Sequence, residues 1–100
     1  MSETLRGRPE VDVSVALCTW NGRRWLPAFL ESLAAQERLP DELVVQDDAS
    51  DDDTVEILED LADNLPFPVR LEVNEHRLGS SANFAAALGR CRGRYLALAD

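Results

Sequence analysis

Residues 42–54 read ELVVQDDASDDDT, a short apolar run that passes directly into a run of carboxylates. The apolar part, residues 42–46, has the length and valine content of a strand that is buried on both faces of a sheet. Beyond the carboxylates, apolar residues recur at the spacing of one helical face: Val55, Leu58, Leu61, Ala62 and Leu65. The stretch therefore predicts a strand, a polar loop and a helix, in that order.

The same unit comes before this stretch. Residues 11–18, VDVSVALC, predict another valine-rich strand, and the turn-forming residues 19–22, TWNG, end it. A helix is expected over about residues 23–36, because Pro27 suits a first helical turn and the following apolar residues have helical spacing. Its apolar face comprises Leu26, Phe29, Leu30 and Leu33.

The unit also follows the stretch. Residues 69–73 alternate apolar and charged side chains, which suits a strand nearer the edge of a sheet. After a loop, Ser80 or Ser81 is expected to cap a third helix, and residues 95–99 predict a last strand. The helix is expected to bury Phe84, Leu88 and Cys91, and its C-terminal dipole to be complemented by Arg90, Arg92 and Arg94.

This alternation of strands and helices predicts an α/β fold, a Rossmann-like parallel sheet with helices on both faces and right-handed crossovers. In such sheets, ligands bind beyond the carboxyl ends of the strands. That rule directs attention to residues 19–22, to residues 47–53 and to Asp100, which directly follows the last strand.

Composition limits the classes of function. A chain of 100 residues, 45% of them hydrophobic, suits one globular core, and a net charge of −9 argues against a nucleic-acid binder. Residues 1–10 are expected to be a polar extension, and since no apolar run reaches the roughly 18 residues of a membrane span, we expect a cytoplasmic location. Cys18 and Cys91 are expected to be buried free thiols, outside any disulfide or zinc site.

Polar side chains follow each of the first two strands. The indole of Trp20 could stack on a planar ligand, while Thr19 and Asn21 offer hydrogen bonds; ordinary turn packing is the alternative. Asp47 and Asp48 directly follow the second strand, so at least one should project into the crevice. Asp51, Asp52 and Asp53 are assigned to the start of the next helix, with Ser50 and Asp53 resembling a capping box.

The loop at residues 74–83, NEHRLGSSAN, places Gly79 and small residues before a helix, where backbone N–H groups can meet a phosphate. Asn83 is a second candidate there, and a helix-surface position is its alternative. Arg77 is the only cation of the loop, and we interpret it as an exposed side chain without a ligand.

Two other functions share these residues. A calcium loop would use Asp48, Ser50, Asp52 and Glu59 at EF-hand positions, but Asp53 stands where glycine is needed. A receiver-like module would bind Mg²⁺ through an acidic cluster, although such a cluster would follow the first strand. A non-catalytic nucleotide- or metal-binding module therefore stays as the alternative to an enzyme.

Four blocks together resemble glycosyltransferase family 2, whose members are inverting enzymes with the GT-A fold. They are VSVALCTWNG (13–22), LESLAAQ (30–36), ELVVQDDASDDDT (42–54), and NEHRLGSSANFAAAL followed by GRYLALAD (74–100). The third block is the most specific, and the fourth is similar to rhamnosyltransferase-like members. Ala49 stands where glycine is commoner, a change we expect to cost little, Cys18 stands where proline or threonine is frequent, and Ala82 stands where an arginine is often found.

The resemblance implies transfer of a hexosyl or rhamnosyl group from a UDP- or dTDP-sugar to a saccharide or lipid-linked acceptor, in cell-wall or polysaccharide biosynthesis. The implied nucleotide-sugar contacts are Cys18, Thr19, Trp20, Asn21, Asp47, Asp48, Gly79, Asn83 and Asp100. Trp20 would contact the base and Asp48 would accept a hydrogen bond from its imide. Asp100 would be the first carboxylate of a DxD motif beside Mg²⁺ or Mn²⁺.

The resemblance also implies that residues 11–100 are the N-terminal, nucleotide-sugar-binding half of a GT-A domain. The general base and the acceptor site would lie downstream, so no catalytic residue is assigned and the fragment is expected to be inactive alone. The resemblance also implies a cytoplasmic protein that can occupy a peripheral position at the inner membrane face. We also expect self-association, because the last strand would leave an open sheet edge.

Overall fold

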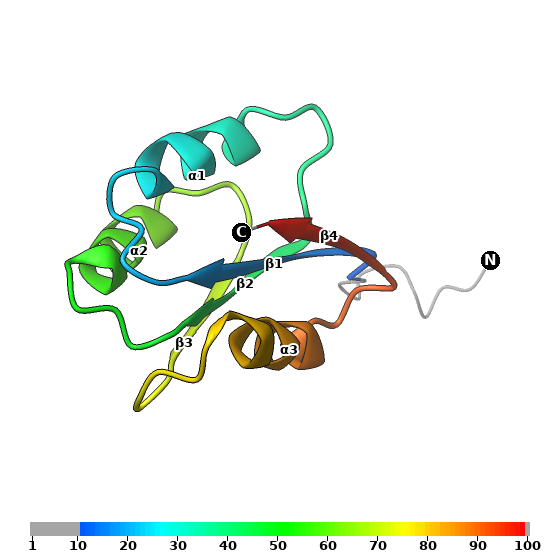
Figure 1. The fold of residues 1–100 in the computed structure, drawn as a ribbon. Coiled ribbons are helices and arrows are strands. Elements are labelled where there is room, and N and C mark those ends of the chain that lie inside the picture. Colours follow the sequence, from blue (N-terminus) through cyan, green and yellow to red (C-terminus); the bar gives the residue numbers. More distant parts are fainter. Residues whose placement is uncertain (1–10, 100) are drawn as a thin grey trace.

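The sheet consists of the strands that the sequence predicts. The computed structural model describes residues 11–99. Their strands are β1 (Val13–Thr19), β2 (Glu42–Asp47), β3 (Val69–Val73) and β4 (Tyr95–Ala99). They form one sheet in the order β3-β2-β1-β4, and every neighbouring pair is parallel, which confirms the predicted architecture (Figure 1). β3 is an edge strand, as its alternating pattern predicts.

Three helices connect these strands within the described residues. They are α1 (Leu26–Ala34), α2 (Thr54–Ala62) and α3 (Ser80–Arg90), with α1 and α2 on one face of the sheet and α3 on the other (Figure 1). Pro27 lies in the first turn of α1, as expected. α1 starts later than predicted because the residues after Gly22 form a turn, in which Trp25 and Leu26 both donate their N–H to the Gly22 carbonyl.

The apolar core lies between the sheet and the helices α1 and α2. Alternate residues of β1 and β2 face it, together with the predicted apolar face of α1. Its buried members are Val15, Leu17, Leu26, Leu30, Leu33, Leu43, Val45, Leu58 and Phe67. Each fully buried leucine contributes about 1.5–3 kcal/mol to folding, so this face supplies much of the hydrophobic stabilisation.

The face of the sheet under α3 carries buried polar side chains beside the apolar Ala16 and Val44. Glu42 is 3% exposed and accepts hydrogen bonds from the Ser14 hydroxyl (2.6 Å), the Arg92 N–H (2.8 Å) and the Arg70 Nε (3.0 Å). Nearby, the Arg90 guanidinium donates to the Val45 carbonyl. We call the side chains of Ser14, Glu42, Gln46, Arg70 and Arg90 the polar layer. The sequence did not predict it.

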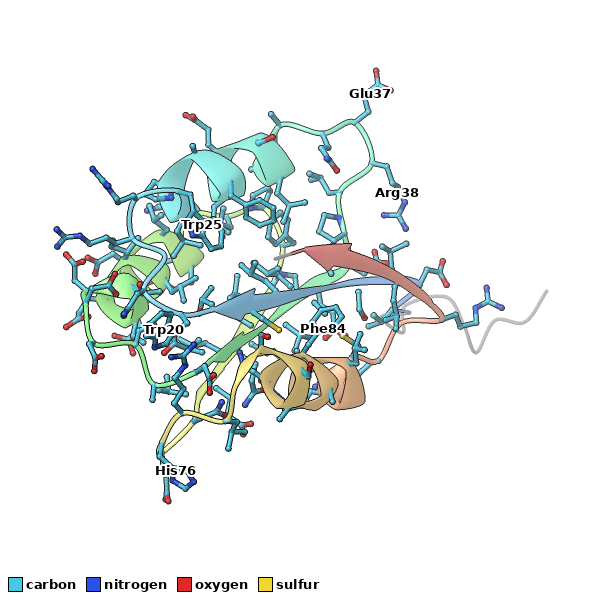
Figure 2. The ribbon with its side chains drawn as sticks, viewed as in Figure 1. Trp20, Trp25, Glu37, Arg38, His76 and Phe84 are labelled. Carbon is cyan, nitrogen blue, oxygen red and sulfur yellow. The ribbon has the colours of Figure 1, made fainter. Side chains whose placement is uncertain are left out.

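The polar layer corrects the expected orientation of α3. Asn83 and Ala87 are its buried residues, while the expected Phe84, Leu88 and Cys91 are half-buried; Figure 2 shows Phe84 on the sheet side of the helix. Small and amide side chains let α3 approach a polar surface that large apolar groups would not satisfy. Arg90 reaches the sheet rather than solely complementing the helix dipole, and both cysteines are half-buried thiols outside any disulfide.

The helix caps also differ from expectation. Gly79, with φ of +97°, is the N-cap of α3, so Ser80 and Ser81 already belong to the helix. At α2 the N-cap is Asp53, whose side chain makes no capping hydrogen bond. The predicted capping box is therefore wrong.

We predict that Glu42→Gln lowers the free energy of unfolding by about 2–3 kcal/mol at pH 7, because the Arg70 charge loses its buried partner. Burial raises the pKa of Glu42, but hydrogen bonds from Ser14, Arg92 and Arg70 outweigh it and hold the pKa below its usual value. This stabilisation is therefore present above the unfolded pKa, near 4.5, and is lost as the pH falls through the lower folded pKa.

Urea denaturation of both proteins from pH 7 to pH 3 measures the effect. The difference in the free energy of unfolding between Glu42→Gln and the parent should narrow below about pH 4.5. The free energy of unfolding of the exposed variant Glu37→Gln should stay within about 0.5 kcal/mol of the parent at every pH. A gap that is absent at pH 7 would contradict the role given to Glu42.

Candidate functional site at the carboxyl ends of the strands

The loops that follow β1 and β2 are joined by hydrogen bonds. The Asn21 N–H donates to the Ser50 hydroxyl (2.9 Å), and the Asn21 side-chain oxygen accepts from the Asp51 N–H (2.8 Å). The Gly22 N–H donates to the Thr54 hydroxyl at 2.9 Å. Two of the three places selected from the sequence therefore form one continuous surface, and Asn21 is a bridge between them.

Asp47 shapes the turn after β2. It is fully buried, and its Oδ1 accepts hydrogen bonds from the hydroxyls of Thr19 (2.6 Å) and Ser50 (2.7 Å). Its Oδ2 accepts the Ser50 N–H at 2.9 Å. Thr19 and Asp47 are register partners in the sheet, so neighbouring strand ends supply this contact. Thr19 and Asp47 therefore stabilise the loops of the site.

Asp48 is a buried carboxylate at the same edge, 2% exposed. Its Oδ1 accepts from the Leu78 N–H (2.7 Å) and the Asn74 amide (2.9 Å), and its Oδ2 accepts from the Gly79 N–H (2.9 Å). Burial raises the pKa of Asp48, but these hydrogen bonds and the charge of Arg77 outweigh it, and the pKa lies below its usual value. Asp48 is therefore ionised at neutral pH.

Trp20 and Arg77 form the exposed mouth of the site. Trp20 is 42% exposed, and the guanidinium carbon of Arg77 lies 3.6 Å from the centre of its ring. Arg77 Nε also lies 3.8 Å from Asp48 Oδ2. Arg77 is exposed, as expected, with 54% of its side chain accessible, but it also contacts two candidate residues of the site. The sequence signal for these contacts was that Arg77 is the only cation of its loop.

The remaining candidates are Gly79, Asn83, Cys18 and Asp100. The Gly79 N–H, expected to meet a phosphate, donates to Asp48 instead. Asn83 is buried, not on the helix surface: its Nδ2 donates to the Gln46 carbonyl at 3.0 Å, and its Oδ1 accepts from Asn74. Cys18 is half-buried near the end of β1. Asp100 lies outside the described residues.

Within residues 11–99, no three or more acidic, histidine or cysteine side chains are grouped so that they could hold a metal ion. The reason is that the chain uses the carboxylate oxygens: Asp48 serves the β3–α3 loop, and Asp52 accepts from the Thr54 N–H at the start of α2. Ser50 bonds to Asp47. An EF-hand also needs a helix before its loop, and the strand β2 stands there instead.

Other surface features of the described residues lie elsewhere. A groove between α1 and α2 is lined by Pro27, Ala28, Leu30, Glu31, Leu61, Asn64 and Leu65, and includes no candidate residue. Within residues 11–99, no helix has the length and apolar character needed to cross a membrane.

Comparisons with known proteins agree with this arrangement. The family model described as glycosyl transferase family 2 matches residues 14–100. An uncharacterised protein of Mycobacterium tuberculosis is 33% identical over 88% of the chain, and the abequosyltransferase RfbV of Salmonella typhimurium is 32% identical over 83%. The chain spans about a quarter of the length of these relatives, 26% of each.

Solved structures give the same result. Crystal structures of S. aureus TarS in complex with UDP and with UDP-GlcNAc match 89% of the chain with TM-scores of 0.79 and 0.80, at 28% identity. The chain covers 27% and 26% of those proteins.

Ala49 generates a prediction about stability. Its φ is +59°, a left-handed conformation that costs a residue with a Cβ about 1–2 kcal/mol, so the expectation that alanine costs little here is wrong. Ala49→Gly should therefore raise the free energy of unfolding by about 1 kcal/mol. The same change at exposed Ala85 inside α3 should lower it by about 1 kcal/mol. Urea denaturation measures both changes in the free energy of unfolding. Changes of the same sign at the two positions would contradict the role given to the φ of Ala49.

Proposed function

The chain belongs to glycosyltransferase family 2, and from that membership we propose that it binds the nucleotide of a nucleotide-diphospho-sugar whose sugar is transferred, with inversion, to an acceptor hydroxyl. The receiver-like alternative does not agree with the family match over residues 14–100. Residues 11–100 would form the nucleotide-sugar-binding half of a GT-A domain, after a polar extension at residues 1–10.

One observation carries this proposal: Arg77 contacts both an exposed indole, Trp20, and a buried, ionised carboxylate, Asp48, at the carboxyl edge of a parallel sheet. Trp20 offers a face for a flat base, and Asp48 offers an acceptor for an imide N–H. A carboxylate has about four acceptor positions, and described residues fill three on Asp48. A uracil or thymine imide suits the position that is left. The TarS complexes with UDP and UDP-GlcNAc support this choice.

The nine candidate residues would then have two kinds of role. Trp20 and Asp48 would contact the base. Thr19, Asn21 and Asp47 would keep the two loops together, as their hydrogen bonds do in the structure. The rest of the proposed nucleotide-sugar site is Cys18, Gly79, Asn83 and Asp100.

The divalent cation stays part of the proposal. The oxygens of Asp47 and Asp48 are directed to donors of the chain, so these residues do not fit a cation. We assign Mg²⁺ or Mn²⁺ to Asp100, the first carboxylate of a DxD motif, where a cation would neutralise diphosphate charge. The general base that deprotonates the acceptor is not assigned to any residue of this chain.

The sugar, the acceptor and the location are also proposals. Similarity to an abequosyltransferase supports a hexosyl or rhamnosyl donor with a saccharide or lipid-linked acceptor, as used in cell-wall or polysaccharide biosynthesis. Such acceptors suit a cytoplasmic enzyme that acts at the inner membrane face.

We predict that Asp48→Ala weakens UDP binding roughly ten- to hundredfold, because a hydrogen bond to a charged group contributes about 1.5–3 kcal/mol. Titration calorimetry with UDP and Mn²⁺ measures this. Asp52→Ala is the control, since that carboxylate bonds to Thr54 at the start of α2 and should affect stability more than affinity.

A second ligand separates base recognition from loop damage. Cytosine has an acceptor where uracil has the imide N–H, so the parent should prefer UDP to CDP and Asp48→Asn should lose that preference. Loop damage would weaken both nucleotides alike. Equal affinity of Asp48→Ala and the parent for UDP would end the assignment.

We also propose self-association through the β4 edge. Among the described residues β4 ends the sheet, and Leu96 on it is 46% exposed. Sedimentation should show mass increasing with concentration, and Leu96→Lys should reduce that increase. Leu78→Lys, at an equally exposed loop position, should leave it unchanged. A strict monomer at high concentration would contradict this proposal.

A further inference from the structure

Asn74 occupies a central position that none of the preceding roles uses. It directly follows β3, and its N–H donates to the Asp47 carbonyl at 2.8 Å, which extends the sheet by one hydrogen bond. Its Nδ2 donates to Asp48 Oδ1 (2.9 Å) and to Asn83 Oδ1 (2.8 Å), while its Oδ1 accepts from the Gln46 amide (2.8 Å). One side chain therefore connects β2, α3 and the buried carboxylate.

These contacts require an amide at position 74. Two hydrogens on one atom serve two acceptors, and an oxygen on the other side accepts from Gln46. The orientation of the amide is fixed by its partners, since the Gln46 oxygen is itself held by Arg90 at 2.7 Å. Ionised aspartate would lose both donors, and alanine would lose every side-chain contact.

We propose that Asn74 is a positioning residue, which holds the Asp48 carboxylate in the orientation that receives the nucleobase. The inference rests on the proposed function. Asn74 itself touches no nucleotide in this proposal. It acts by donating to Oδ1, so that Oδ2, which accepts the Gly79 N–H, is the oxygen that Arg77 Nε approaches at 3.8 Å.

The charged groups around Asp48 define how the variants should respond to pH. Arg77 comes from the β3–α3 loop, and Asp47 precedes Asp48 but bonds to Thr19 and Ser50. Glu72 on β3 accepts from the Gln46 amide that also contacts Asn74. Of these groups, Arg77 is the one that faces Asp48 with opposite charge.

Two variants at position 74 should change nucleotide binding in opposite directions with pH. In Asn74→Ala, Asp48 loses a donor, so its pKa should rise and UDP affinity should fall at a higher pH than in the parent. In Asn74→Asp, the protonated acid can donate to Asp48 at low pH, whereas two adjacent carboxylates repel at high pH. That variant should bind UDP better at pH 5 than at pH 8.

The experiment measures UDP affinity by calorimetry from pH 4 to pH 8, relative to the parent at the same pH, which cancels protonation of the diphosphate. Asn74→Ala should bind about tenfold more weakly at the acid end of this range, where its raised pKa protonates Asp48 before that of the parent. Glu37→Gln is the control, because Glu37 is an exposed side chain in the loop between α1 and β2; its ratio to the parent should be independent of pH. Carbon-13 NMR of the Asp48 carboxyl gives its pKa directly, without a nucleotide.

The two readouts distinguish the possible failures. An unchanged Asp48 pKa in folded Asn74→Ala, with a pH-independent affinity ratio, would overturn the positioning role. A raised Asp48 pKa in Asn74→Ala supports that role even if Asp48→Asn keeps the parent's preference for UDP, a result that would overturn the proposed function alone. If Asn74→Ala does not fold, Asn74→Asp at pH 5 and pH 8 decides, and equal affinity ratios at both would overturn the inference.

Discussion

A buried negative charge at the end of β2 is the constraint on which the site depends. Asp48 is removed from water, and an ionised carboxylate in that position must be paired with donors. The chain supplies them from the loop after β3, whose Leu78 and Gly79 N–H groups converge on it. The positive φ of Gly79 belongs to the same arrangement, since it ends this loop and starts α3. The carboxylate thus sets the path of a loop some thirty residues away along the chain.

Asp47 is a second buried carboxylate, and its hydrogen-bond donors come from the other side of the strand end. Its partners come from β1 and from the turn at Ser50, so it joins the first two βα units while Asp48 joins the second and the third. Adjacent carboxylates directed to opposite sides of a strand end follow from the alternation of side chains along a strand. The acidic run that suggested a ligand site is therefore also the framework of that site.

Much of the fold was predictable because its signals are local. The valine-rich runs and helical spacing identified every strand and helix of residues 11–99, and short connections between them predicted a parallel sheet. Helix ends were predicted less well: Gly79 replaced Ser80 as cap because the Asp48 contact needs its N–H in that geometry. The polar layer under α3 was missed, since Glu42 and Arg70 look like solvated charges until the sheet places them together. The contacts of Asn74 and Arg77 with Asp48 were missed for the same reason, because Asp48 lies 26 and 29 positions away from them in the sequence and apolar periodicity does not reveal such contacts.

The central claim is that Asp48, held by its own chain, still offers an acceptor to a base stacked beside Trp20. A crystal structure of the chain with UDP tests it most directly. The claim predicts the uracil ring beside the Trp20 indole, with its imide nitrogen about 2.7–3.1 Å from an oxygen of Asp48 and the Leu78 and Gly79 N–H groups still bound to that carboxylate. A uracil bound elsewhere, or one that meets Asp48 only after those N–H groups have been released, would contradict it.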